Sequence, residues 1–203
     1  MTSLAIDQNR LSTFCIFNMN FVDFLCYFAF GSLFFPLMNL VTTFLVRRID
    51  NQIDESSVSD ISVKLVSAFH GILGCIIGVA IMSSCKNDII HSRNWLTEIY
   101  AAFGLSYMVY DVFAMYVTHI LDNPQIKKWQ LHKRIYHYIH KNKLILLHHT
   151  GLPFIYVPVI FYFRNGKGDF FIGTFFTMEM AVPCISFRWI MLRLGRTDVV
   201  QAK

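Results

Sequence analysis

The sequence predicts an all-α, polytopic transmembrane helical bundle of about five spans, and three observations lead to that prediction. Apolar residues make up 55% of the 203 residues, while charged residues make up 15%, well below the roughly 25% of a soluble domain. Apolar stretches of about twenty residues alternate with short polar ones, and that length is enough for a helix to cross a bilayer. Every backbone group in hydrocarbon must be hydrogen-bonded, so we expect helices rather than open strands.

The predicted spans follow one another with short polar connections. They cover residues 24–46, 61–83, 96–121, 144–163 and 170–192. The first is expected to bend at Pro36, and Ser59 or Asp60 is expected to cap the second. Residues 1–23 then form a polar N-terminal segment, residues 24–194 the membrane domain, and residues 195–203 a polar tail.

The positions of Lys and Arg predict the orientation of the bundle, because cytosolic loops carry an excess of these residues. One side of the predicted topology holds Arg47, Arg48, Lys127, Lys128, Lys133, Arg134, Lys141, Lys143, Arg193, Arg196 and Lys203. The other side holds only Arg10, Lys86, Arg93, Arg164 and Lys167. We therefore expect a lumenal or exterior N-terminus and a cytosolic tail. The basic, aromatic segment 123–142 fits an interfacial helix on an anionic leaflet and a solvated loop equally well.

Composition also argues against two other classes of protein. The net charge of +5 does not indicate nucleic-acid binding, because the basic residues follow the predicted topology and do not interleave with aromatic residues. The five cysteines form an odd set without a CxxC pair, which argues against a disulfide framework and a zinc site.

Titratable residues inside four of the spans are the candidate functional residues. They are His70, Asp111, His148, His149 and Glu179. Such groups are costly in hydrocarbon and usually face the interior of a bundle or a cavity. At about 1.5 Å of rise per residue, their expected depths from the cytosolic ends of their spans run from roughly 6–8 Å for the histidine pair to about 20 Å for Glu179. We therefore expect a polar pocket that opens toward the cytosol.

This combination of imidazole and carboxylate groups suits proton transfer. A neutral imidazole is a usable general base near pH 7, and a carboxylate that accepts its other N–H holds the tautomer. The set fits removal of a proton from an amine or hydroxyl during acyl transfer, with Tyr107 and Tyr110 either binding substrate or packing the core. Metal binding is disfavoured because no HxxxH or ExxH spacing occurs. A His–carboxylate pair could equally serve only to lock helices together.

Several ordered motifs resemble the TLC-domain family, which includes translocation-associated membrane proteins and ceramide synthases of the endoplasmic reticulum. They span about Gly31 to Leu194 and are KLVSAFHG, SCKNDIIHSRNWL, YDVFAMY, the His148-His149 pair, and GKGDFFIG followed by Glu179 and Pro183. The likeness is strongest to the ceramide-synthase-like branch, the TLC domain-containing proteins of the third subgroup. Members of that branch continue for further membrane helices, so this chain is expected to be C-terminally short.

The resemblance implies a bundle that encloses a lipid-binding cavity in the endoplasmic reticulum membrane. It also implies N-acylation of a sphingoid base by acyl-CoA arriving from the cytosol, with His148 and His149 as the catalytic pair and no further cofactor. The ceramide-synthase motif continues with a Ser-Tyr pair, a His-Asp pair and further acidic residues. Here residues 166–183 hold only Asp169 and Glu179 as acidic groups.

Two functions therefore stay open at this point. The chain is either a ceramide-synthase-like acyltransferase or a non-enzymatic regulator or sensor of membrane lipid composition. A cargo receptor or assembly factor, as found elsewhere in the wider family, is a third reading. The expected partners are membrane lipids, with acyl-CoA and a sphingoid base if the chain is an enzyme, and the oligomeric state is left open.

Overall fold

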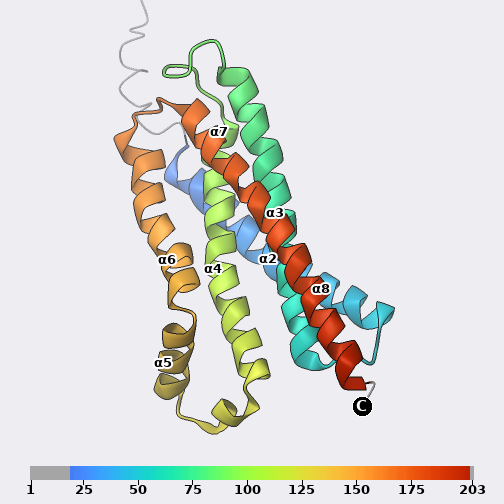
Figure 1. Cartoon of the computed structure of the whole chain (residues 1–203). Coiled ribbons are helices and arrows are strands. Elements are labelled where there is room, and N and C mark those ends of the chain that lie inside the picture. The colour runs from blue at the N-terminus through green and yellow to red at the C-terminus, as the bar shows by residue number, and fades with distance from the viewer. Residues whose placement is uncertain (1–18, 202–203) are drawn as a thin grey trace, which may run out of the picture.

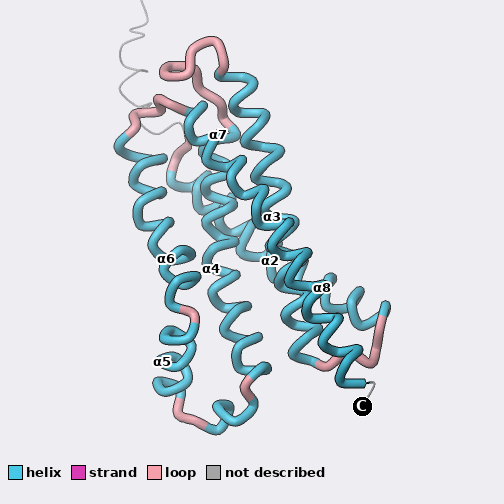
Figure 2. Tube along the Cα trace, in the orientation of Figure 1, coloured by secondary structure: helices cyan, strands magenta, loops and turns pink. Residues whose placement is uncertain are grey.

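The computed structural model describes residues 19–201, and every regular element in that range is a helix (Figure 1; Figure 2). The elements are α2 (Phe21–Ile49), α3 (Glu55–Cys85), α4 (Leu96–Asp122), η1 (Pro124–Lys128), α5 (Leu131–Lys141), α6 (Lys143–Pro158), the π-helical turn η2 (Val159–Phe163), α7 (Asp169–Thr177), η3 (Met178–Met180) and α8 (Ala181–Gln201). The all-α prediction is confirmed. The predicted polar N-terminal segment falls largely on residues 1–18, outside the described part of the chain.

Within that described part, five helical segments are long and apolar enough to cross a membrane. They are Phe21–Ile49, Glu55–Cys85, Leu96–Asp122, Lys143–Phe163 and Asp169–Gly195. The chain is therefore an integral, multi-pass membrane protein, as predicted. The turn at residues 50–54, the η1–α5 segment and the end of α8 lie at one end of the bundle (Figure 1), so the predicted Lys/Arg-rich loops share that end.

The second span begins earlier than expected, and the predicted N-cap was wrong. The cap of α3 is Asp54, whose side chain accepts a hydrogen bond from the Ser57 N–H. Asp60 lies inside the helix and accepts a hydrogen bond from the Trp189 indole of α8, while Ser59 pairs with a hydroxyl of α4. The polar first turn of α3 thus extends the helix beyond its apolar stretch. In α2 the helix continues through Pro36 without a break, and the bend expected there stays a prediction.

Helix α3 is the centre of the bundle, packed against α2, α4, α7 and α8. Its glycines allow close approach to the last span, since a Cβ on Gly78 would lie 2.5 Å from the Gly173 carbonyl oxygen. A Cβ on Gly71 would lie 2.7 Å from the Glu179 carbonyl oxygen. Small residues of this kind let membrane helices pack backbone to backbone. By contrast, α6 has no fully buried residue and packs mainly on α4.

We expect Gly78→Ala to lower the thermal unfolding midpoint of the detergent-solubilised chain. The added methyl group meets a backbone carbonyl, which cannot move aside as a flexible side chain could, and overpacking of this kind costs about 1–3 kcal/mol. Gly195→Ala is the matched control, because no atom of the described part of the chain lies within 4 Å of its added Cβ. Equal midpoints for the two variants would contradict the close packing of α3 and α7.

Candidate functional site

His70 and two tyrosines form a buried cluster between α3 and α4. The His70 ring stacks on Tyr107, with ring centroids 3.9 Å apart. Its Nε2 lies 3.2 Å from the Tyr100 hydroxyl, and that hydroxyl also reaches the His70 backbone carbonyl at 3.2 Å. Gly104 leaves the space that the imidazole occupies, because a Cβ there would lie 3.4 Å from Nε2. The imidazole is therefore held in one position against α4.

Asp111 and His149 form a second pair, between α4 and α6. The Asp111 Oδ2 lies 3.5 Å from the His149 Nδ1, and the two side chains are only 5% and 11% exposed. His149 Nδ1 makes no hydrogen bond to the described residues, so this contact is an ion-pair distance without hydrogen-bond geometry. Catalytic hydrogen bonds are often this long before substrate binds. Tyr107 connects the two clusters, since its ring also lies 6.2 Å from that of His149.

An apolar pocket lies beside these clusters. Its walls come from α4, α6, η2 and α7, and its polar groups are those of His70, Tyr100, Tyr156 and Glu179. All other lining residues are apolar. The pocket thus has the composition expected of a site for an apolar chain with a few polar groups that orient it.

The structure brings together four of the five predicted titratable residues, in two adjoining groups. His70 and Glu179 line the pocket, and Asp111 pairs with His149 next to it. His148 is exposed on α6, although its ring lies 5.4 Å from that of His149 and it interacts electrostatically with Glu179. Consecutive helical residues point about 100° apart, which places the adjacent histidines in different surroundings.

The predicted tyrosines differ in their placement. Tyr107 is buried and joins the His70 cluster to the Asp111–His149 pair, but it does not line the pocket. Tyr110 is half-buried beside Phe35, and its hydroxyl makes no hydrogen bond to the described residues.

Three residues of this region were not predicted. Tyr100 lies two helical turns before Tyr107, and Tyr156 lies two turns after His149, so each shares a helix face with a predicted residue. That spacing was the signal that could have identified both. Lys64 of α3 interacts electrostatically with Asp111 and His149, and its presence inside an apolar span was the corresponding signal.

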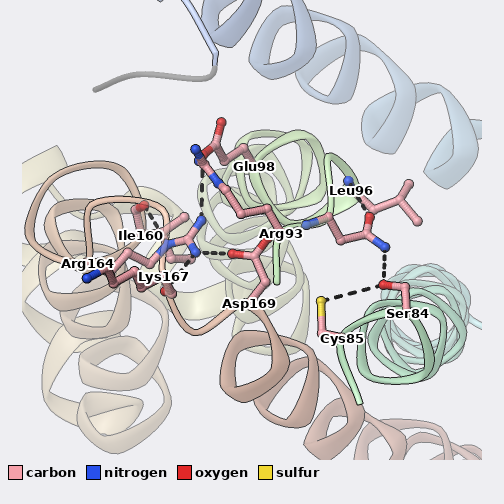
Figure 3. Close-up of polar contacts among 10 residues, drawn as sticks. Ser84, Cys85, Arg93, Leu96, Glu98, Ile160, Arg164, Lys167 and Asp169 are labelled. Carbon is pink, nitrogen blue, oxygen red and sulfur yellow. Dashed lines mark hydrogen bonds and ion pairs between the residues drawn. The ribbon is translucent and has the colours of Figure 1, made fainter. Parts of the chain in front are cut away.

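A group of charged residues joins the helices of the pocket walls at the end of the bundle away from α5 (Figure 3). Arg164, which follows η2, pairs with the buried Asp169 at the start of α7 and lies 3.6 Å from Glu98 of α4. Asp169 also accepts a hydrogen bond from the Asn94 N–H at 2.6 Å. The turn between Arg164 and Asp169 requires left-handed backbone at Gly166 and Gly168, with φ of 70° and 73°. We call this group the Arg164–Asp169 latch.

A family model described as the TLC domain matches residues 60–202, which is well over half of the chain. No solved structure matches the chain.

We expect Asp169→Asn to destabilise the chain by about 3 kcal/mol, because the buried Arg164 charge loses its nearer carboxylate and keeps only Glu98, at 3.6 Å. The measurement is the thermal midpoint of the solubilised chain. Asp88→Asn is the control: this carboxylate is exposed and bonded only within its own turn, so its removal should change stability by less than about 0.5 kcal/mol. Similar midpoints for both variants would show that the latch does not stabilise the bundle.

Proposed function

Since the chain belongs to the TLC-domain family and is a lipid-related membrane protein, we propose that it transfers an acyl group from acyl-CoA to the amine of a sphingoid base. The observation that carries this proposal is the buried Asp111–His149 pair beside an apolar pocket with a polar end. Its place in the ceramide-synthase-like branch and in the endoplasmic reticulum membrane belongs to the same proposal.

The pocket supports binding of a long-chain lipid. An alkyl chain gains free energy by leaving water for an apolar cavity, at roughly 0.8 kcal/mol per methylene group. The apolar walls of α4, α6, η2 and α7 suit such a chain, with its polar head toward Tyr100, Tyr156 and Glu179. Because the Tyr156 hydroxyl is buried and makes no hydrogen bond to the described residues, it is free to donate one to a bound polar group.

The Asp111–His149 pair supports the chemical step. In the proposed reaction the amine nitrogen attacks the thioester carbonyl carbon, and His149 takes the proton that the nitrogen loses. Asp111 holds the imidazole in position and stabilises its protonated form. The carbon–sulfur bond then breaks, and the proton passes to the departing CoA thiolate. His148 is exposed on α6 and interacts electrostatically with Glu179, which lines the pocket.

A non-enzymatic lipid sensor is the second candidate, and two observations favour it. His148 is exposed, and His149 lacks a hydrogen bond to Asp111. In a sensor the same pocket would bind a lipid without transforming it. The enzyme needs the imidazole of His149, whereas the sensor needs only the apolar walls.

We expect membranes that contain the chain to make labelled ceramide from labelled sphinganine and acyl-CoA, and His149→Ala to lower that rate by about 10²–10⁴-fold, the usual contribution of a general base. His91→Ala is the control, because His91 is exposed and, among the described residues, its ring pairs only with Asp88. Lipids that copurify with each variant should be measured by mass spectrometry. Copurified lipid without any product, from folded wild-type chain, would reject the enzyme and favour the sensor.

A further inference from the structure

Helix α5 carries an apolar stripe that no other part of the described chain covers. Leu131, Ile135 and Ile139 are all exposed, and their four-residue spacing puts them on one face of the helix. Tyr136, beside them, is 71% exposed. A helix face that is exposed to water is usually polar, so this apolar stripe indicates an apolar or amphipathic environment.

The charge around that stripe has a single sign. Residues 123–142 contain Lys127, Lys128, Lys133, Arg134 and Lys141, and no Asp or Glu. Two adjoining hollows on this surface share Trp129 and Lys133, and one of them also includes His132 and His140. Tryptophan, tyrosine and lysine together are typical of the level of lipid headgroups, where an aromatic ring meets both apolar and polar surroundings.

The position of α5 fits that level. It ends at Lys141, and the spanning helix α6 begins at Lys143, so α5 lies just outside the apolar part of α6. In Figure 1 it stands beside the end of α4 rather than away from the bundle. Two contacts hold it there: the Tyr138 hydroxyl donates to the Val112 carbonyl at 3.0 Å, and His137 lies 3.0 Å from His119, nitrogen to nitrogen.

The Tyr138 contact persists at any physiological pH. Burial, and then the nearby Asp111 carboxylate, raise the pKa of Tyr138 to about 12, so the phenol keeps the proton that it donates. The inner face of α5 is therefore attached to α4, which leaves the apolar stripe and the lysines to face outward.

We propose that η1 and α5 form a binding surface for the anionic phospholipid headgroups of the membrane leaflet at the basic end of the bundle. The lysines pair with headgroup phosphate or carboxylate groups, and the apolar stripe inserts at the edge of the acyl chains. This binding is separate from the pocket and does not depend on the proposed acyl transfer. Only Asn142 separates α5 from α6, the helix that carries His148 and His149. Lipid bound to α5 therefore also affects the position of α6.

The test measures which phospholipids remain bound to the full chain. The wild type, exchanged into mixed vesicles of phosphatidylcholine and phosphatidylserine and then solubilised, should retain phosphatidylserine in excess over the vesicle composition. Lys128→Gln with Lys133→Gln should weaken phosphatidylserine binding by about 10- to 30-fold, from the usual contribution of two surface lysines. Lys86→Gln with Lys167→Gln removes two exposed lysines at the opposite end and should leave the excess unchanged.

A second measurement uses the wild type only, so it tests the lipid-binding proposal even if the double variant does not fold. Hydrogen exchange of residues 131–141 in the wild type should be slower in nanodiscs that contain phosphatidylserine than in nanodiscs of phosphatidylcholine alone. The difference should shrink at high salt, because exposed charges are then screened. Equal exchange in the two lipids, or equal loss of phosphatidylserine from both double variants, would overturn the proposal.

Discussion

The structure depends on one constraint: a polar group inside hydrocarbon has no water to bond and must find its partner within the protein. His70 meets this requirement with the Tyr100 hydroxyl and stacks on Tyr107, and Asp111 lies within ion-pair distance of His149. Each of these contacts joins two different helices. The groups that could form a chemical site are therefore the same groups that fix the helices relative to one another. For this reason the sequence alone is compatible with either a functional or a structural role for each of them.

The unequal packing of the helices gives that site its shape. On one side, the glycines of α3 let the last span approach so closely that a Cβ added to them would collide with its backbone carbonyl oxygens. On the other side, α6 packs mainly on α4, touches α7 through Tyr156 and Phe175, and buries none of its residues fully. The pocket lies on this looser side, with walls from α4, α6, η2 and α7. A tightly packed half of the bundle thus lies beside a looser half that contains the pocket.

The two ends of the pocket region are secured in different ways. At one end the Arg164–Asp169 latch joins η2 to α7, with the charges buried and paired with each other. At the other end α5 is attached to α4 by Tyr138 and carries exposed lysines. The charges of the first end are paired within the protein, whereas those of the second are exposed and are the basis of the proposed binding of anionic lipid headgroups.

The sequence by itself determined the helical fold, the five spans and the residues that could do chemistry. Bilayer thickness sets the length of a span, and titratable residues inside an apolar span are rare enough to be recognised in the sequence. Tyr100 and Tyr156 were within reach of the same reasoning, since each lies two turns from a predicted residue. Only the tertiary structure decided that Asp111 meets His149, because α4 runs on past the start of α6 beside α5. It also decided the exposure of His148, the Asp54 cap and the latch. The rotation of each helix about its own axis and its level relative to its neighbours depend on contacts between distant segments, and a local sequence pattern does not predict them.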